Sequence, residues 1–418
     1  MTNRIFMLMI LSVLLIIIDL YIYKAVSSSF SKWTLKKQKV FRNIFWTYSA
    51  LILAGVFVSI YFNIRLTARA IILVAFFLTF VTKACFLLFL FLDDLRRGAT
   101  WLKRKLFAQS LPQEPNSAKD NSIPRSEFLV KAGTLVAAIP FASLTYGIAS
   151  GAYDYTVVKQ KLVLPNLPRS FEGMTLAQIS DIHSGSFYNR KAVLGGVEKL
   201  LAQKPDMIFF TGDMVNNLAS EMRDYQDIFS KMKAPLGVFS VLGNHDYGDY
   251  HFGKEPSAAK TQNLIDIKLT HKNMGWDLLL NENRKVKING EEIAIVGIEN
   301  WGAGRFVRHG RLDLAVKGTD DTPVKFLLSH DPSHWRAQVI KEYPQIDAMF
   351  SGHTHGMQFG VRMEELQWSP VQYIYPEWAG LYQEADQQLY VNVGYGFLGY
   401  PGRVGIQPEI TIFELSRS

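Results

Sequence analysis

The chain carries two different patterns of hydrophobic and polar positions, and the change between them falls near residue 157. Residues 1–157 contain four long apolar runs, whereas the later apolar runs are short. Each long run has about the 20 residues that a helix needs to cross a bilayer core of about 30 Å. Four transmembrane helices are therefore predicted, at residues 5–23, 44–62, 70–92 and 128–150, with buried helices of a soluble core as the alternative. The fourth run is weaker because it contains Gly133 and Pro140.

Residues 158–418 contain short apolar runs that predict β-strands joined by helices. Apolar positions recur every three to four residues within 193–201 and 218–232, which is typical of amphipathic helices. The order strand, helix, strand indicates parallel strands with crossover helices. Three further short strands, at 278–280, 284–288 and 293–298, are separated by Asn-containing turns. We therefore predict an α/β (α+β) domain with a mixed sheet, most simply two packed sheets, preceded by an all-α transmembrane domain.

Acidic, amide and imidazole side chains follow directly after the predicted strands. None of the nine histidines lies before residue 183. Five of them belong to motifs that close strands at 175–180, 207–211, 237–242, 326–328 and 348–350, namely Asp181-Ile182-His183, Gly212-Asp213, Gly243-Asn244-His245-Asp246, Ser329-His330 and Gly352-His353-Thr354-His355. Singly, each residue could be a helix cap, a turn residue or a satisfied buried histidine. Together, beyond the carboxyl ends of strands, they predict a metal site without thiolate ligands.

The five motifs, in this order, resemble those of the calcineurin-like metallophosphoesterase superfamily over roughly residues 160–418. The resemblance implies a four-layer β-sandwich flanked by helices around two divalent metal ions. It implies one ion held by Asp181, His183 and His355, and a second held by Asn244, His330 and His353, with Asp213 bridging the two. It also implies that His245 contacts the scissile phosphate and that Asp246 orients His245. One departure is Asn216, where the family often has Asp; this position is expected to lie outside the ligand shell.

These residue types suit hydrolysis at phosphorus. Two divalent cations roughly 3.5 to 4 Å apart can share a hydroxide and neutralise the attacking and leaving oxygens of an in-line displacement. Imidazole and amide ligands add no charge, so an anionic phosphate is still attracted. Mixed nitrogen and oxygen ligands favour Mn, Fe or Zn, and the sequence does not select among them. A protonated His245 could donate to the leaving group.

The net charge of +8 is divided unevenly along the chain. Residues 1–157 hold 18 Lys/Arg and 7 Asp/Glu, a net charge of +11, which leaves 27 and 30 in residues 158–418, a net charge of −3. The second domain lacks the basic surplus that nucleic-acid binding requires, so nucleic acid is not an expected partner and a nuclease is disfavoured.

The Lys and Arg residues also predict an orientation in the membrane. Residues 24–43 hold six of them and residues 93–127 hold seven, whereas residues 63–69 hold two. Positive loops stay cytoplasmic. With four spans, residues 93–127 form a cytoplasmic linker and the second domain is extracytoplasmic, in a bacterial cytoplasmic membrane; if the fourth run does not cross, this reverses. Residues 126–131 resemble the start of a twin-arginine export signal, but only Arg125 stands where a pair is required.

Two ionisable residues lie well inside the predicted spans. Asp19 and Lys83 are candidates for a function in the membrane by the cost of burying charge there. The plain alternative, which we favour, is an interfacial Asp19 and a snorkelling Lys83. The only cysteine, Cys85, lies in the third span, so no disulfide framework is possible.

Several residues outside the motifs invite weaker interpretations. His251, His271, His309 and His334 are expected on the surface or in loops, with His251 and His309 as weak candidates for substrate contact. Arg305, Arg308 and Arg311 could meet a second phosphate, but a solvated loop is the plainer interpretation. An aromatic-rich tract follows the last motif, and it could form a flap at the membrane surface as well as core.

The sequence therefore predicts a membrane-anchored, binuclear-metal phosphoesterase that hydrolyses a phosphodiester or pyrophosphate on a phosphorylated small molecule or a lipid-linked substrate. The stretches 395–403 and 408–411 resemble the tail of the membrane-associated branch, which includes bacterial UDP-2,3-diacylglucosamine pyrophosphatases of lipid A assembly. The alternative is a non-catalytic sensor or transporter with a phosphate-binding metal domain. The predicted outward orientation counts against the lipid A precursor, which is expected in the cytoplasm.

Overall fold

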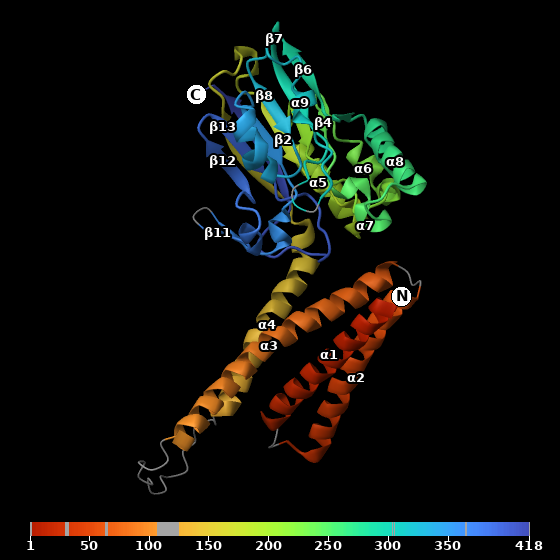
Figure 1. Ribbon diagram of the computed structural model, residues 1–418, viewed down its shortest axis with the longest axis vertical. Helices are drawn as coiled ribbons and strands as arrows, with labels where there is room; N and C mark the ends of the chain where they lie inside the picture. Colours follow the sequence, from red (N-terminus) through yellow and green to blue (C-terminus); the bar gives the residue numbers. More distant parts are fainter. Residues whose placement is uncertain are drawn as a thin grey trace. The chain divides into compact units, whose positions relative to one another are not determined.

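The structure, a computed structural model, describes residues 2–29, 33–62, 66–106, 125–302, 304, 306–363 and 366–417. It divides into two compact units, residues 1–145 and 146–418, which we describe separately (Figure 1). Residue 146 rather than 158 thus begins the second unit. The shift arises because the chain from Gly147 onward is already hydrogen bonded within that unit: the amide of Arg403 donates to the carbonyl of Gly147 at 3.2 Å, and the Tyr188 hydroxyl donates to the carbonyl of Ile148 at 2.8 Å.

The first unit is built from four helices: α1 Thr2–Ser29, α2 Leu35–Tyr61, α3 Leu66–Leu106 and α4 Arg125–Ala149, whose last turn lies in the second unit. Within the described residues, three segments are long and apolar enough to cross a membrane: Leu35–Ser59, Ile71–Lys103 and Lys131–Tyr153. Many of their large apolar side chains are exposed within the unit, as expected for helices whose solvent is lipid. The all-α membrane-spanning region is thereby confirmed, while four crossings stay a prediction.

The predicted linker 93–127 begins later than its polarity suggests. Helix α3 continues to Leu106, and Arg96 pairs with Asp93 one turn away at 2.7 Å. Hydropathy measures where an apolar run ends, but a helix rich in good helix formers continues into water. Most of the remaining predicted linker lies outside the described residues.

The two ionisable residues of the spans form an ion pair. Lys83 of α3 contacts the carboxylate of Asp19 of α1 and donates to the hydroxyl of Ser49 of α2 at 3.4 Å. The side chain of Asp19 is only 2% exposed and that of Lys83 is 16% exposed. Lys83 is therefore paired instead of reaching for water, so the snorkelling interpretation is wrong, while an interfacial position of Asp19 stays a prediction. Pairing was energetically preferable because each charge alone would stand in an apolar environment.

The second unit contains two six-stranded mixed sheets. The first has the order β1 Thr156–Val163, β14 Glu409–Ser416, β2 Thr175–Ile179, β3 Met207–Phe210, β4 Val238–Ser240, β5 Asp277–Leu278. The second has the order β12 Gly380–Glu384, β13 Gln387–Val391, β9 Ala348–Ser351, β8 Lys325–Leu328, β7 Glu291–Gly297, β6 Glu282–Ile288. A short hairpin, β10 Val361–Arg362 and β11 Gln367–Trp368, stands apart from both sheets.

Alternation along the strands explains why the sheets pack in four layers. Leu176 and Phe209 point into one core with Phe326 and Phe350 of the second sheet, whereas Phe210 points to the opposite face. That outer face is covered by α5 Arg190–Leu201, α6 Gln226–Phe229 and α8 Ala258–Met274, and α7 Asp249–Phe252 lies nearby. The outer face of the second sheet is covered by α9 Leu312–Ala315, the π-helical segment Trp335–Val339 and α10 Ile340–Glu342. The predicted sandwich flanked by helices is confirmed.

One predicted helix is divided in two. Residues 218–232 form a 3₁₀ segment Ala219–Asp224 and the short α6 instead of one continuous helix. The carboxylate of Glu221 accepts hydrogen bonds from the backbone amides of Asn216, Asn217 and Leu218. These bonds tighten the first turn and favour 3₁₀ geometry over α-helical geometry there.

Candidate metal centre

The strand order brings the predicted ligands together. Parallel strands β2, β3 and β4 are neighbours in the first sheet, and the loops after them carry Asp181 and His183, Asp213, and Asn244. Parallel strands β8 and β9 are neighbours in the second sheet, and they lead to His330 and to His353 and His355. All these strands end at the same edge of the sandwich, so residues up to 174 positions apart in sequence converge.

Asp181, His183 and His355 form one group. The Nε2 atom of His355 lies 3.2 Å from Oδ1 of Asp181, and the Nε2 atom of His183 lies 3.9 Å from the same oxygen. One candidate ligand atom from each residue lies within 4.8 Å of those from the other two. All three residues are buried, so water does not fill the space around them freely.

Asp213, His330 and His353 form a second group. The Nε2 atom of His330 lies 3.1 Å from Oδ2 of Asp213 and 3.2 Å from Nδ1 of His353. The same Oδ2 atom of Asp213 also lies 3.5 Å from Nε2 of His183, which belongs to the first group. Asp213 therefore stands between the two groups, where a bridging carboxylate would stand.

The donor atoms of the site fit two divalent ions. Both ring nitrogens of His183 are buried and have no hydrogen-bond partner, and the same is true of the amide oxygen of Asn244. A buried polar atom without a partner costs about 1–3 kcal/mol, so such atoms are rare unless something else binds them. Imidazole nitrogens, carboxylate oxygens and one amide oxygen suit Mn, Fe or Zn.

Several ligand residues have strained backbone conformations, which are typical of functional sites. Asp181, His183, Asp213, His353 and His355 all have positive φ angles, between 47° and 74°. Such conformations cost on the order of 1–3 kcal/mol each outside glycine and persist where the surrounding structure enforces them. Aspartate and histidine tolerate the left-handed region better than most residues, so the ligands themselves can occupy the turns.

Glycines in the motifs allow the loops to approach one another. A Cβ atom on Gly352 would lie 2.2 Å from Oδ2 of Asp181, and one on Gly243 would lie 2.1 Å from Oδ1 of Asp213. A side chain at Gly243 would crowd the Asp213 carboxylate, and one at Gly352 would crowd the Ser180 hydroxyl, at 1.9 Å, as well as the Asp181 carboxylate. The motif glycines are therefore explained by close packing as well as by turn geometry.

Hydrogen bonds fix the orientation of the imidazoles. The Nδ1–H of His330 donates to the carbonyl of Thr211 at 2.8 Å, which leaves Nε2 as its ligand atom. The Nε2 atom of His353 lies 2.7 Å from the hydroxyl of Tyr375, which leaves Nδ1 to face His330. Such partners fix the tautomer and typically change metal affinity by about 10–100-fold when removed.

His245 lies beside the first group, with its ring centroid 4.9 Å from that of His183 and stacked on Tyr250 at 4.6 Å. Its Nδ1–H donates to the carbonyl of Asn216 at 2.7 Å. The backbone of Asn216 thus orients His245, while its side chain pairs with the hydroxyl of Ser186. A change from Asp to Asn at this position leaves that backbone contact intact.

Asp246 lies next to His245 in the chain and contacts backbone amides. Its carboxylate accepts hydrogen bonds from the amides of Gly243, Asp213, Met214 and Val215 at 2.9–3.3 Å, whereas Nδ1 of the His245 ring bonds to the carbonyl of Asn216. Asp246 therefore ties the loop after β4 to the loop after β3. A carboxylate has enough lone pairs to serve four donors, which a motif alone does not reveal.

Electrostatics hold most ligands in forms that can bind a cation. Burial raises the pKa of Asp213, but the neighbouring His330 and His245 outweigh this and hold it well below its ordinary value. Burial also raises the pKa of Asp181, but the neighbouring His355 outweighs this and lowers it below its ordinary value. Burial lowers the pKa of His183 and of His353, so both are neutral. Burial lowers the pKa of His330, but Asp213 outweighs it and raises the value to about 10, so an incoming ion displaces a proton there.

Two histidines outside the motifs are not where they were expected. His271 and His334 are completely buried, where the surface or a loop was predicted. Each is satisfied in part by a serine: Nδ1 of His271 lies 2.9 Å from the Ser240 hydroxyl, and Nδ1 of His334 lies 3.0 Å from that of Ser329. Burial lowers the pKa of His271 to about 3 and that of His334 to about 4, so both are neutral core residues.

The remaining candidates make contacts of their own among the described residues, and substrate contact stays a prediction for His251 and His309. His251 is exposed, and His309 stacks on Tyr247 at 4.0 Å. The guanidinium of Arg308 lies over the ring of Trp301 at 3.9 Å, and Arg311 pairs with Asp313 at 2.7 Å. Arg305 lies outside the described residues.

One residue near the site was missed by motif analysis. Arg403 is completely buried and donates to the carbonyls of Val393, Gly394, Gly396 and Ile406, and its Nη2 atom lies 3.4 Å from Nδ1 of His355. It fixes the loop after β13 against the ligand loops. The glycines around it, in Gly394-Tyr395-Gly396 and Gly402-Arg403, were the available signal that the backbone folds closely there.

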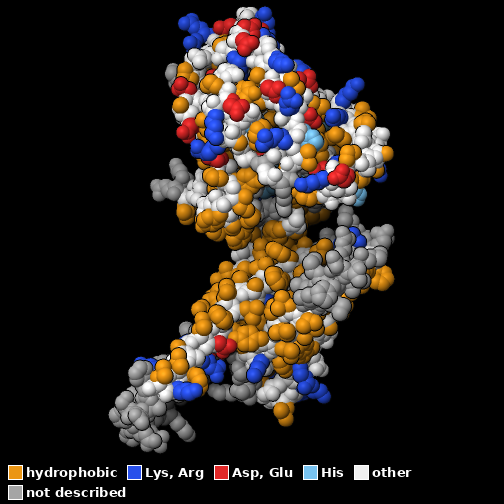
Figure 2. Space-filling view, in the orientation of Figure 1, with side chains coloured by type: hydrophobic (Ala, Val, Ile, Leu, Met, Phe, Trp, Pro, Cys, Tyr) orange, Lys and Arg blue, Asp and Glu red, His pale blue; other side chains and the backbone are white. Residues whose placement is uncertain are grey.

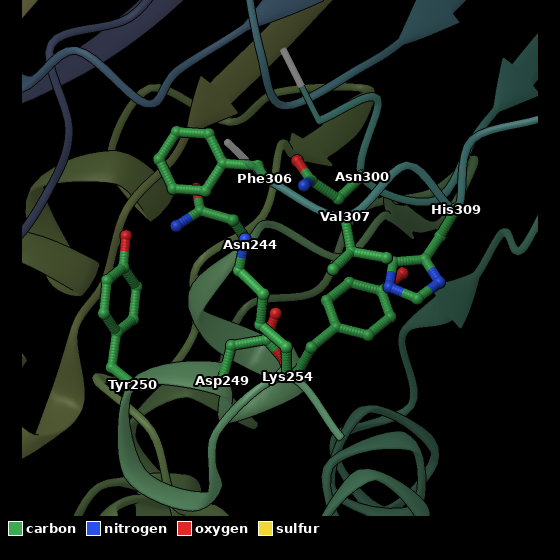
Figure 3. Close-up of a pocket in the computed structure, with 9 residues that line it drawn as sticks. Asn244, Asp249, Tyr250, Lys254, Asn300, Phe306, Val307 and His309 are labelled. Carbon is green, nitrogen blue, oxygen red and sulfur yellow. The ribbon is translucent and has the colours of Figure 1, made fainter. Parts of the chain in front are cut away.

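A pocket opens next to the metal centre at Asn244 (Figure 3). Tyr247, Tyr250, Phe306 and Val307 give it largely apolar walls, with Asp249, Lys254, Asn300 and His309 completing the lining. The ring of Phe306 also meets that of His353 at 5.5 Å. The pocket therefore adjoins two predicted ligands, Asn244 in its lining and His353 beside Phe306.

Comparison with known proteins assigns both units. Residues 3–152 match the transmembrane domain of calcineurin-like phosphoesterases, and residues 174–357 match the calcineurin-like phosphoesterase domain. The chain therefore belongs to the calcineurin-like phosphoesterases. It is an integral membrane member of that family, whose enzymes use two divalent metal ions, and its two His/Asp groups could hold such a pair.

Relatives of this phosphoesterase occur in animals and bacteria. The chain is 30% identical over 295 residues to a transmembrane protein with metallophosphoesterase domain from Danio rerio, covering 68% of this chain and 63% of that protein. It is 28% identical over 254 residues to the metallophosphoesterase YkuE of Bacillus subtilis, and the match covers 60% of this chain and 81% of YkuE. Among solved structures, a dimetal phosphatase from Danio rerio is similar, with a TM-score of 0.35 and 12% sequence identity. The match covers 59% of this chain and 93% of the phosphatase. The chain thus spans just under two thirds of its zebrafish relative.

Proposed function

We propose that this phosphoesterase hydrolyses a phosphodiester or pyrophosphate bond at its metal centre. The observation that carries the proposal is the position of Asp213, within 3.1 Å of His330 and 3.5 Å of His183, between two ligand groups. Asp181, His183 and His355 would hold one ion, and Asn244, His330 and His353 the other, with Asp213 shared. When bound, such an ion pair supplies a hydroxide nucleophile and charge neutralisation at the phosphoryl group.

Residues of the protein itself hold a proton, position the ligand loops and bind the substrate. Because Nδ1–H of His245 is engaged by the carbonyl of Asn216, Nε2 is the nitrogen free to hold a proton at a phosphoryl or leaving-group oxygen. Asp246 keeps the loops that carry Asn244 and Asp213 in register through four amide bonds. The pocket beside Asn244 receives the organic part of the substrate, and its apolar walls limit the water around the leaving group.

The finer parts of the proposal concern substrate, metal and sidedness. A lipid-linked phosphate is favoured by the membrane anchor, and UDP-2,3-diacylglucosamine is a candidate by resemblance alone. Manganese is proposed as a working ion on the donor set. We further propose four spans and an extracytoplasmic second unit in a bacterial cytoplasmic membrane, because α1 Thr2–Ser29 has the length of a span and the basic residues cluster in residues 24–43 and 93–127.

Two substitutions test the catalytic proposal. Full-length protein in detergent is assayed with bis-p-nitrophenyl phosphate and Mn²⁺, and its bound metal is measured. Asp213→Ala should abolish both turnover and metal binding, because it removes the shared ligand. His245→Ala should retain metal and lower kcat by about 10² or more. Wild-type protein that binds metal without hydrolysing esters would instead support a sensor or transporter, and wild-type behaviour of both variants would refute the site.

A reporter fused to the carboxyl terminus tests the sidedness. An external signal supports four crossings and favours envelope phospholipids or nucleotides as substrates. A cytoplasmic signal refutes the proposed orientation and removes the objection to the lipid A precursor.

A further inference from the structure

An exposed apolar surface lies on the segment that follows the last metal-ligand motif. Tyr373 is 77% exposed and Ile374 is 65% exposed, which is unusual for side chains of this size. We call the exposed large apolar residues of this segment the 357–374 surface; its members are Met357, Phe359, Met363, Leu366, Trp368, Tyr373 and Ile374. In Figure 2, hydrophobic side chains gather at the end of the second unit where β11 lies, whereas charged side chains gather at the end where β6 and β7 lie. A contiguous apolar surface of this kind marks an interaction site.

The 357–374 surface is held firmly against the metal centre. The hydroxyl of Ser369 donates to the carbonyl of Gly356 at 2.8 Å, directly after the ligand His355. The hydroxyl of Tyr375, one residue beyond Ile374, meets His353 at 2.7 Å. A small core of Val371, Trp378, Ala379, Val393 and Ile406 lies beneath. Trp368, Tyr373 and Ile374 are therefore next to residues that are hydrogen bonded to the ligand loops or packed in this core.

The same surface is linked by hydrogen bonds to the carboxyl end of the last candidate span. The candidate span Lys131–Tyr153 ends inside the second unit. The amide of Arg403 donates to the carbonyl of Gly147 at 3.2 Å, and the side chain of Gln358 donates to the carbonyls of Tyr400 at 2.8 Å and Gly402 at 3.1 Å. Gln358 is the neighbour of Met357. Two short hydrogen-bonded steps thus connect the exit of the span to the 357–374 surface within one compact unit.

Charge decides what kind of partner the surface suits. The guanidinium of Arg362, in β10, is taken up by an ion pair with the buried Glu409. No cation is therefore available among the described residues of the surface to attract acidic lipids or an acidic protein. Tryptophan and tyrosine together with Met, Leu and Ile match the interfacial layer of a bilayer, where amphipathic rings accumulate.

We propose that the 357–374 surface docks into the interfacial layer of the phospholipid bilayer that holds the spans. Docking places the metal centre over lipid phosphates, so the substrate class is an amphiphile that stays in the membrane during hydrolysis. This second statement depends on the proposed function; the docking itself does not. Because apolar burial drives it, docking is insensitive to salt and needs no acidic lipid.

Docking is tested with the full chain in phosphatidylcholine nanodiscs. An NBD dye is attached to Leu366→Cys or Ile374→Cys in a Cys85→Ser background, with Lys287→Cys in β6 as the control on the charged end. At positions 366 and 374 we expect NBD emission that is blue-shifted in nanodiscs and quenched when lipids with spin-labelled headgroups are included. At position 287 we expect neither the blue shift nor the quenching. Emission typical of water at 366 and 374, or shielding that persists without lipid as in a contact between proteins, overturns the proposal.

Substrate class is tested with two esters that share a leaving group. Hexadecyl p-nitrophenyl phosphate is embedded in the nanodisc, and bis-p-nitrophenyl phosphate is dissolved in the buffer. Tyr373→Ser combined with Ile374→Ser should lower kcat/KM for the embedded ester about tenfold or more and leave the soluble ester unchanged, because two anchoring side chains are lost. Equal losses on both esters overturn the assignment of substrate class. If wild type hydrolyses neither ester while the dyes are quenched, the proposed function fails and the docking stands.

Discussion

The ion pair between Asp19 and Lys83 allows a quantitative prediction about the membrane unit. The pair connects α1 and α3, and Ser49 of α2 completes it, so three helices meet at one charged contact. Removing one partner leaves a buried charge alone, at a cost of about 3–5 kcal/mol in protein interiors. Scales for a charge at the centre of a membrane helix give about 2.5–3.5 kcal/mol. Both estimates agree on about 3 kcal/mol for either Asp19→Asn or Lys83→Met.

The single cysteine offers the assay. Cys85 lies in α3, two residues beyond Lys83, and is partly buried. Opening of the helix bundle exposes its thiol, so the rate of reaction with a maleimide dye in detergent reports the free energy of opening. Each single variant should react roughly 10²-fold faster than wild type, since 1.4 kcal/mol corresponds to a factor of about ten. The double variant should be destabilised by less than the sum of the singles, and the exchanged pair Asp19→Lys with Lys83→Asp should recover most of the stability.

A second ion pair on the same helix serves as the control. Arg96 and Asp93 are one turn apart, and the Arg96 side chain is 44% exposed. Exposed pairs contribute less than about 1 kcal/mol, so Arg96→Gln should label at nearly the wild-type rate. If Asp19→Asn and Lys83→Met also label at the wild-type rate, or if their effects simply add, the charges do not stabilise one another and the reasoning from burial is refuted.

Three further predictions concern the second unit. Gly352→Ala should displace the Asp181 carboxylate together with Ser180, because its Cβ would lie 1.9 Å from Oγ of Ser180 and 2.2 Å from Oδ2 of Asp181. Elemental analysis should show loss of an ion with the fold intact by circular dichroism, and an unchanged metal content would contradict this. Tyr375→Phe should weaken metal binding about 10–100-fold in a titration, since it removes the hydroxyl at Nε2 of His353; equal affinity would show that this bond does not orient the ligand. His271 is neutral in the fold with a pKa of about 3 against an unfolded value near 6.5, so its contribution is complete above pH 6.5 and is lost as the pH falls toward 3. Between pH 7.5 and pH 5, wild type should therefore lose about 2 kcal/mol more unfolding free energy than His271→Gln, which thermal unfolding at the two pH values measures. If both proteins lose the same amount, the assignment is refuted.

The ligand set could be proposed from sequence because of where it lies on the strands. A short apolar run followed by Asp or His is a local feature that can be recognised in the sequence. The carboxyl ends of parallel strands lie at the same edge of a sheet, whatever the length of the connections between the strands. For that reason Asp181 and His355 could be proposed as neighbours although 173 residues separate them. The strands that lead into the motifs were predictable on the same basis, since length and apolar content are local properties, whereas β1, β12, β13 and β14 were not predicted.

Contacts that depend on backbone atoms could not be predicted in this way. The partners of Asp246 are four amides, and the partner of His245 is a carbonyl, so no side-chain motif specifies either contact. Helix α8 was not predicted because its buried positions include Asn263, Thr270 and His271 and form no apolar stripe. The pairing of Asp19 with Lys83 depends on how helices lie beside one another, which hydropathy does not contain.

The exit of the last span bears on how this phosphoesterase reaches its substrate. A boundary at residue 157 would leave a free connection between the last span and the sandwich. Instead, the hydroxyl of Tyr153 accepts hydrogen bonds from the amides of Tyr188 and Asn189, and a Cβ on Gly151 would lie 2.1 Å from the carbonyl of Arg403. The last turn of α4 is consequently part of the same compact unit as the ligand loops. A substrate confined to the bilayer surface, as we propose, would require no long flexible tether between the last span and the ligand loops.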